Sequence, residues 1–268
     1  MAQGKYANVN GLKLYYEIHG TGKPLLLLHG GLGTVGMFEQ ILPRLAEDRQ
    51  VIGVELQAHG HTADIERPLS FEFMADDIAA LIKQLRLGQA DVMGYSLGGG
   101  VALQTAIRHP DVVRKLILVS APCKSDGWYP EVRTGMKLMN AEAAKAMVGS
   151  PMHQAYVSVA PNPDGWQTLV AKTGQLVSQD YDWSKDVAAI KTPTMIVVGD
   201  ADGVRTAHAV EFFELLGGGK KDAGWDGSGT SNARLAILPA TTHYNIIFSP
   251  MLGSTVTPFL DAPVPDAP

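Results

Sequence analysis

The sequence predicts an α/β protein in which a parallel β-sheet is covered by helices on both faces. Short apolar runs that end at glycines alternate with helix-length segments whose apolar residues recur every three or four positions. Strands separated by helices run parallel, because each helix returns the chain to the same edge of the sheet. An apolar content of 46% in 268 residues is ample for one large core.

The N-terminal part is expected to begin with a hairpin and to continue as this alternation. Residues 5–18 alternate polar and apolar side chains around Asn10-Gly11, a strong two-residue turn signal. Strands are expected over 24–29, 51–56 and 90–95, and helices over 38–48, 71–87 and 97–109. Pro110 ends the last of these helices.

The C-terminal part is expected to continue the pattern around one interruption. Strands are expected over 116–120, 194–199 and 235–238, and helices over 206–216 and 246–260. Residues 122–190 lack strand patterning and are rich in Met and Trp, which predicts a mostly helical insertion. We therefore expect a core of residues 1–121 and 191–262, a helical cap over 122–190, a mobile loop over 217–233 and a disordered tail over 263–268.

Composition excludes several classes of function. The formal net charge is −5 and Lys and Arg are scattered, so we expect neither nucleic acid nor a membrane as a partner. Cys123 is the one cysteine, which excludes an internal disulfide and a thiolate-rich metal site. The N-terminus lacks the apolar segment of a signal peptide, and its longest aliphatic run, 25–28, is far shorter than a membrane span. We expect a cytoplasmic protein that is a monomer or a homodimer.

Ser96 lies in Gly94-Tyr95-Ser96-Leu97-Gly98, which matches the G-x-S-x-G pattern of a nucleophilic serine. The pattern alone is weak in a chain with 29 glycines, where a plain glycine-rich turn looks the same. Its setting strengthens it, because a predicted strand ends at Tyr95 and a predicted helix begins at Leu97. Such a turn strains the backbone of the serine, and side chains at 94 or 98 would collide with neighbouring backbone. We therefore predict that Ser96 is a nucleophile.

A nucleophilic serine needs a base and an acid that orients the base, and here both are expected to follow it in the order acid, then histidine. Of the four histidines after Ser96, only His243 directly follows a predicted core strand, at the edge where catalytic groups of parallel sheets gather. Asp200 and Asp202 both follow the strand 194–199. We favour Asp202, which has the reach to meet His243, and expect Asp200 to hold the turn through bonds to backbone.

The negative oxygen that forms during acyl transfer needs backbone N–H donors, one of them from the residue after the nucleophile, Leu97. The second is expected from the glycine-rich segment 29–33, with Gly31 as the favoured donor and Leu32 as the alternative. Tryptophan and methionine suit an apolar pocket, although in helical segments they also serve as core packing. The residues expected to contact substrate are Leu32, Tyr95, Trp128, Met136, Met139 and Trp166.

His59-Gly60-His61-Thr62-Ala63-Asp64 is similar to the H-x-H-x-D core of metallohydrolases. No matching set of ligands follows it along the chain. We therefore interpret this segment as a loop near the rim of the pocket and expect no metal.

With these residues assembled, the chain resembles the α/β-hydrolase superfamily in its compact, capped, esterase-like branch. The resemblance is densest over 24–122, in LLLLHGGLGT, VIGVELQAHGHT and GYSLGGGVALQTAIRHPDVVRKLILVSAP, and resumes at TPTMIVVGDADGV and LPATTH. It implies an eight-stranded, mostly parallel sheet with a cap after the sixth strand, and a Ser96–Asp202–His243 triad without metal or organic cofactor. One departure is Glu55-Leu-Gln-Ala-His59-Gly60, where many relatives carry D-x-R-G-H-G; it bears on the subgroup rather than the mechanism.

The resemblance and the residues together imply a carboxylesterase that cleaves small carboxylic esters or lactones through an acyl-enzyme on Ser96. Lactonases, including those of acyl-homoserine lactones, perhydrolases and C–C bond hydrolases use the same triad and stay open as alternatives. A serine at 96 excludes relatives that form an ester on an aspartate, such as haloalkane dehalogenases and epoxide hydrolases. The non-enzymatic alternative is a hydrolase-fold receptor that binds a small ligand under the cap.

Overall fold

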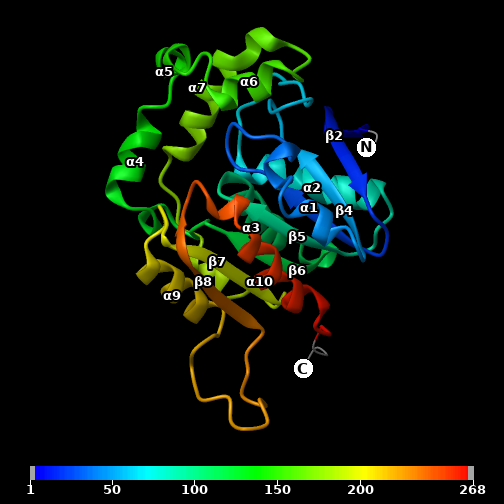
Figure 1. Cartoon of the computed structure of the whole chain (residues 1–268), viewed down its shortest axis with the longest axis vertical. Helices are drawn as coiled ribbons and strands as arrows, with labels where there is room; N and C mark the ends of the chain where they lie inside the picture. The colour runs from blue at the N-terminus through cyan, green and yellow to red at the C-terminus, as the bar shows by residue number, and fades with distance from the viewer. Residues whose placement is uncertain (1–3, 265–268) are drawn as a thin grey trace.

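The computed structural model describes residues 4–264, and its centre is one eight-stranded sheet (Figure 1). The strands are β1 Lys5–Val9, β2 Leu12–His19, β3 Lys23–Leu28, β4 Arg49–Glu55, β5 Ala90–Tyr95, β6 Val113–Val119, β7 Thr194–Ala201 and β8 Ala233–Thr242. They lie in the order β1-β2-β4-β3-β5-β6-β7-β8. The β1–β2 and β2–β4 pairs are antiparallel and all others are parallel. The predicted eight-stranded, mostly parallel sheet is thereby confirmed.

Helices cover both faces of this sheet. One face is covered by α2 Phe71–Gln84, α3 Leu97–Arg108 and α9 Thr206–Leu215, and the other by η1 Val35–Phe38, α1 Leu42–Leu45, η5 Ile246–Phe248 and α10 Pro250–Asp261. The apolar residues of β3 pack against the helices on both faces of the sheet. Leu26 and Leu28 pack with the first set of helices, and Leu25 and Leu27 pack with the second. Such a strand has no polar face, so its sequence is an unbroken apolar run.

The chain between β6 and β7 forms helices and no strand longer than an isolated bridge. Its elements are η3 Ser125–Gly127, α4 Pro130–Lys137, α5 Ala141–Ala146, α6 Pro151–Val157, η4 Pro163–Gly165, α7 Trp166–Val177 and α8 Ser184–Val187. Figure 1 shows α4 to α7, in green, beyond one end of the sheet. Within residues 4–264, no helix is both long and apolar enough to cross a bilayer.

Two predicted helices are wrong in extent, and proline explains both. Instead of a helix over 38–48, the chain forms η1 and the four-residue α1, in which Pro43 occupies the first turn. Proline lacks an N–H and is best tolerated in the first turn, which favours a helix that begins beside Pro43 over one that runs through it from residue 38. The helix expected over 246–260 is likewise split, because Pro250 begins α10 and the Ser249 hydroxyl caps it.

The glycine-rich segment before β8 and the described part of the C-terminal tail contain no helix or strand. Residues 216–232 connect α9 to β8 as a long loop that extends from the end of the molecule opposite α4 to α7 (Figure 1), and Ala233, predicted to belong to the loop, begins β8. Its mobility stays a prediction. Of the tail expected over 263–268, residues 263–264 have no regular structure, and the remainder lies outside the described residues.

Lys115 on β6 connects the sheet to the end of the last helix. Its side chain is almost completely buried, and its Nζ donates to the carbonyl oxygens of Phe259 at 2.6 Å, Leu260 at 3.1 Å and Ala262. The last carbonyls of a helix lack partners within the helix and carry partial negative charge. The ammonium group therefore caps α10 from the interior of the protein.

His29 and His59 form a buried pair of imidazoles beside the first parallel strands, with ring centroids 4.9 Å apart. The N–H of Leu56 donates to Nε2 of His29, which leaves the proton on Nδ1, where Gly30 O accepts it at 2.8 Å. Burial, and secondarily the neighbouring ring, lower the pKa of His29 to about 3. Burial lowers the pKa of His59 to about 4. Both rings are therefore neutral in the folded protein at neutral pH.

The substitution Lys115→Met is expected to lower the free energy of unfolding by about 2–3 kcal/mol, because several carbonyls lose a charged donor inside the protein. Urea denaturation followed by circular dichroism measures this change. Lys185→Met on the exposed surface of α8 is the matched control, with an expected change below about 0.5 kcal/mol. Equal urea midpoints for the two variants would contradict a capping role of Lys115.

Acid is expected to destabilise the fold through the buried pair of imidazoles. Below the ordinary histidine pKa of about 6.5, the unfolded chain binds protons that the folded chain does not. Each ring should therefore remove about 1.4 kcal/mol of stability per pH unit between pH 6.5 and about 4, and nothing above that window. The free energy of unfolding of wild type and His59→Gln should be measured at several pH values.

Burial is the larger cause of the lowered pKa of His29, so His29 should stay neutral in both folded proteins over this window. The difference between wild type and His59→Gln should then change with pH by the slope of one proton. His19→Gln, on the partly exposed end of β2, is the control. A difference that stays constant from pH 7 to pH 4.5 would show that His59 does not remain neutral.

Candidate active site

Ser96 lies on a tight turn between β5 and α3. Its backbone has φ 54° and ψ −117°, a conformation that is strained for a residue with a side chain. A Cβ atom on Gly94 would lie 2.1 Å from the carbonyl oxygen of Gly98, and one on Gly98 would lie 2.3 Å from that of Leu28. Both positions therefore require glycine, as the sequence predicts, and the side chain of Ser96 emerges at the carboxyl ends of the parallel strands.

The structure brings Ser96, His243 and Asp202 together at this edge of the sheet. His243 Nε2 lies 3.0 Å from Ser96 Oγ, and His243 Nδ1 lies 3.1 Å from Asp202 Oδ1. Ser96 follows β5, Asp202 follows β7, and His243 follows β8. A hydroxyl, an imidazole and a carboxylate in this sequence of contacts have the geometry of a nucleophile, its base and the acid that orients the base.

Asp202 is a completely buried carboxylate with every oxygen bonded. Oδ1 accepts from the N–H of Val204 at 3.1 Å in addition to His243, and Oδ2 accepts from the N–H of Gly199 at 3.0 Å and the hydroxyl of Ser120. Burial disfavours the charge, but the bond to His243, the attraction of that ring and the other donors outweigh it. They hold the pKa of Asp202 below its ordinary value, so the carboxylate is ionised at neutral pH.

Asp200 has a different role, in agreement with the sequence. Its carboxylate accepts from the N–H groups of Ala240 at 3.0 Å and Thr241 at 3.2 Å. These bonds hold the irregular end of β8 against β7, where the register shifts. Asp200 thus shapes the strand that leads to His243 without contacting the imidazole.

Two residues that hold the histidine and the aspartate have roles that the sequence analysis did not identify. Ser120, at the end of β6, has φ 52° and donates its hydroxyl to Asp202. Tyr95 was expected to contact substrate, but it packs beside His243 with ring centroids 5.4 Å apart and donates its hydroxyl to the His243 carbonyl. The only sequence signal for either role was a position at the end of a predicted strand.

The loop after β3 brings Gly31 close to Leu97. A Cβ atom on Gly31 would lie 3.7 Å from the Leu97 side chain and 3.4 Å from that of Thr173 on α7. Leu97 is the first residue of α3, whose first N–H groups have no acceptor within the helix. Leu32, the alternative donor, has φ 59° and a buried side chain that belongs to the hydrophobic core.

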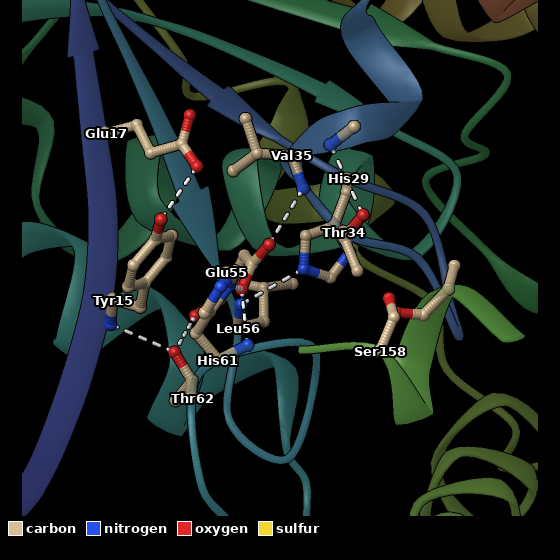
Figure 2. A network of polar contacts seen from close by, with 12 residues as sticks. Tyr15, Glu17, His29, Thr34, Val35, Glu55, Leu56, His61, Thr62 and Ser158 are labelled. Carbon is tan, nitrogen blue, oxygen red and sulfur yellow. Dashed lines mark hydrogen bonds and ion pairs between the residues drawn. The ribbon is translucent and has the colours of Figure 1, made fainter. Parts of the chain in front are cut away.

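A buried glutamate supports this loop, as Figure 2 shows. The Glu55 carboxylate accepts from the backbone N–H of Val35 at 3.2 Å and of His61 at 2.6 Å, and it lies 2.9 Å from His61 Nδ1. The Thr62 hydroxyl donates to the Glu55 carbonyl at 2.7 Å and accepts from the N–H of Tyr15 at 2.9 Å. The segment in which this chain departs from many relatives therefore connects β2, β4 and the loop after β3.

The histidines of the H-x-H-x-D segment do not converge with its aspartate. His61 pairs with Glu55, His59 Nδ1 lies 2.9 Å from a backbone carbonyl, and Asp64 lies 2.6 Å from Lys172 Nζ. Over residues 4–264, no group of three or more His, Cys, Asp or Glu side chains is arranged to hold a metal ion.

A narrow apolar cavity lies beside Ser96, with an open volume of about 30 Å³. The open space directly beside the serine is therefore small. Its lining comes from the start of α2, from the turn between β5 and α3 with the start of α3, and from the segment between β6 and β7. The lining residues are Phe71, Ser96, Leu97, Gly100, Ala121, Pro122, Trp128, Met136, Val177 and Tyr181.

Of the residues expected to contact substrate, the structure places Trp128 and Met136 in this lining and leaves four out. Leu32 and Tyr95 pack elsewhere, as described above. The Trp166 indole is buried within the helical segment and donates to the carbonyl of Ala144 at 3.0 Å. Met139 packs on Gly174 of α7. Phe71, Val177 and Tyr181 line the cavity without having been predicted, because nothing local in the sequence marks them.

Comparison with known proteins identifies relatives among the α/β hydrolases. A family model described as the alpha/beta hydrolase fold matches residues 23–221. The AB hydrolase superfamily protein YisY of Bacillus subtilis (strain 168) is 30% identical over 210 residues, which are 71% of this chain and 78% of that protein. The pimeloyl-[acyl-carrier protein] methyl ester esterase of Neisseria meningitidis serogroup B / serotype 15 (strain H44/76) is 42% identical over 111 residues, 41% of each chain.

Solved structures share the whole fold. The crystal structure of E-2-(acetamidomethylene)succinate hydrolase matches with a TM-score of 0.76 at 20% identity, covering 98% of this chain and 100% of that one. The sheet order, the serine turn at the end of β5 and the match over residues 23–221 agree with one another. This chain is a member of the α/β-hydrolase family.

Proposed function

We propose that this protein is a carboxylesterase that cleaves small carboxylic esters or lactones through an acyl-enzyme on Ser96. The observation that carries the proposal is the continuous set of contacts from Ser96 through His243 to an ionised Asp202, beside an apolar cavity. A serine hydroxyl is a weak nucleophile by itself, and this set of contacts is what activates it. Membership of the α/β-hydrolase family supports hydrolysis as the class of reaction.

The first half of the reaction would transfer the acyl group to the enzyme. His243 Nε2 accepts the proton of Ser96 Oγ while this oxygen attacks the ester carbonyl carbon. Asp202 keeps the other proton of the ring on Nδ1 and stabilises the imidazolium that forms. The N–H groups of Leu97 and Gly31 bind the negative carbonyl oxygen. When the tetrahedral intermediate collapses, the alcohol leaves with the proton from His243.

The second half would release the acid by the same steps with water in place of the alcohol. His243 removes a proton from a water molecule, whose oxygen attacks the acyl carbon bound to Ser96. The second tetrahedral intermediate collapses, Ser96 Oγ recovers its proton from His243, and the carboxylic acid departs. Both halves use the same donors and the same base, so neither a metal nor an organic cofactor takes part in this cycle.

The helices over 130–187 are proposed to act as the cap of this site. Met136 on α4 and Val177 at the end of α7 close the cavity over Ser96. Ligand sites commonly measure 300–1,000 Å³, so a cavity of about 30 Å³ favours a short substituent of the ester. The lining is aromatic and aliphatic, which favours an uncharged group of a few carbon atoms next to the serine.

The rival functions share the triad and differ in substrate. Lactonases, including those of acyl-homoserine lactones, perhydrolases and C–C bond hydrolases would use the same residues. One relative is named a methyl ester esterase, which favours an ester with a small alcohol. A receptor would bind its ligand under the same helices without turnover, so only measured hydrolysis separates it from an enzyme.

Ser96→Ala is expected to lower kcat for p-nitrophenyl acetate by about 10⁴-fold or more, because the nucleophile is lost. A fluorophosphonate probe should label Ser96 in the wild type and no residue in the variant, as mass spectrometry of the labelled peptide will show. Ser254→Ala on the exposed side of α10 is the control and should retain full activity. If wild type and Ser96→Ala cleave a panel of esters and lactones equally slowly, the protein is not a serine esterase.

Ser120→Ala is expected to lower kcat about tenfold, since one hydrogen bond to the charged form of Asp202 is removed. KM should change less than twofold, because Ser120 is buried and outside the cavity lining. The pKa of Asp202 should rise, but from a value below its ordinary range. The kcat deficit should therefore be constant from pH 7 to pH 9 and should grow only in acid, where the carboxylate of the variant begins to bind a proton.

Steady-state kinetics across this pH range check the expectation for Ser120→Ala. Ser249→Ala removes another buried hydroxyl, the cap of α10, and should affect stability but not kcat. A purely structural role of Ser120 would lower the melting temperature and leave both kcat and its pH dependence unchanged.

A further inference from the structure

We infer that the active site has a second, cationic part that binds a carboxylate of the substrate. A separate cavity of about 450 Å³ lies beside α4 and is much larger than the one beside Ser96. Its polar and aromatic lining includes Asp126, Trp128, Arg133, Thr134, Lys137 and Arg205. This inference rests on the proposed esterase function and adds to it a class of substrate, the monoesters of dicarboxylic acids.

Charge is the first observation that points to an anionic ligand. Arg133, Lys137 and Arg205 line the cavity and Asp126 is its one acidic lining residue, although the whole chain carries a net charge of −5. A positive cleft concentrates small anions from solution. The lining of this cavity is thus positively charged although the protein as a whole is negatively charged. The cavity adjoins the proposed catalytic residues through Trp128, which contacts His243.

Protein partners orient the cationic side chains of this cavity but leave them able to bind an anion. Arg133 contacts the carboxylates of Asp126 and Asp180, which are 76% and 81% exposed, so these pairs are weak and a ligand can compete with them. The Arg205 guanidinium donates through Nε and Nη2 to the backbone carbonyl of Asp126, which fixes its position at the wall. Lys137, at the end of α4, is exposed to solvent.

Trp128 connects the two cavities, because it lines both of them. Its indole meets the His243 ring edge-on, with centroids 5.3 Å apart. Its backbone pairs with Val204, and the N–H of Arg205 donates to the carbonyl of Gly127 at 2.8 Å. The indole, the cationic groups and the loop after Asp202 are therefore held together, at a set distance from Ser96.

The sizes of the two cavities determine which end of the substrate lies where. The cavity beside Ser96 has room for a short alkoxy group such as methoxy or ethoxy. In the inferred arrangement the acyl chain would run past Trp128, which lines both cavities, and its far carboxylate would reach Arg133, Lys137 and Arg205. Because the distance between the ester carbon and these cations is set by the fold, one length of dicarboxylic acid should be preferred.

The test compares monomethyl with dimethyl esters of dicarboxylic acids of four to eight carbons. For the preferred length, kcat/KM of the monoester should exceed that of the diester at least tenfold, and the excess should shrink in 1 M NaCl. Lys137→Glu should lower the ratio of monoester to diester about tenfold, and Arg133→Gln should do so to a similar degree. Lys185→Glu on α8, outside the cavity, is the matched control and should leave the ratio unchanged.

A binding measurement separates failure of this inference from failure of the proposed function. Calorimetry with Ser96→Ala protein and the preferred dicarboxylate should show binding that Lys137→Glu weakens about tenfold. If wild type cleaves p-nitrophenyl acetate but no chain length of monoester is preferred and no dicarboxylate binds, the cationic subsite is wrong and the esterase stands. If no ester is cleaved yet the dicarboxylate binds and Lys137→Glu weakens it, the subsite stands and the esterase is wrong.

Discussion

The contact between the start of α3 and the ends of β3 and β5 is the constraint on which the rest of the site depends. Gly94 and Gly98 bring backbone so close to backbone that a single Cβ atom at either position would overlap a carbonyl oxygen. This packing keeps Ser96 in its strained conformation, since the surrounding structure determines the turn completely. Every other functional group is positioned relative to that fixed hydroxyl.

Buried polar contacts position the groups around the serine. Asp202 has four donors from three different segments, and Glu55 on β4 has contacts with Val35 after β3 and with His61 after β4. A buried carboxylate with all its oxygens bonded has one favourable orientation, because any other leaves a charge without partners. Tyr95 adds the same kind of constraint to the backbone of His243. The relative positions of Ser96, His243 and Asp202 are therefore fixed by the protein itself.

Under the proposed function, the helical segment between β6 and β7 would control what reaches Ser96. It closes the space over Ser96 with Met136 and Val177 and presents the cationic residues of α4 on the other side of Trp128. In the proposed esterase, the sheet and its loops would supply the acyl-transfer chemistry and this segment would supply the selectivity. Substitutions in α4 should consequently alter the choice of substrate more readily than the chemical step.

The sequence by itself determined the sheet, the order of its elements and the identities of Ser96, Asp202 and His243 as candidates. These inferences are local: an unbroken apolar run marks a strand buried on both faces, and each candidate follows such a run at the same edge. Only the tertiary structure decided the lining of the cavities and the supporting roles of Ser120 and Tyr95. Phe71 and Tyr181 meet at Ser96 although more than a hundred residues separate them. Such contacts depend on how helices pack, which no local pattern in the sequence records. Tryptophan also occurs both inside the helical segment, as Trp166, and in the cavity lining, as Trp128, so residue type alone does not separate the two roles.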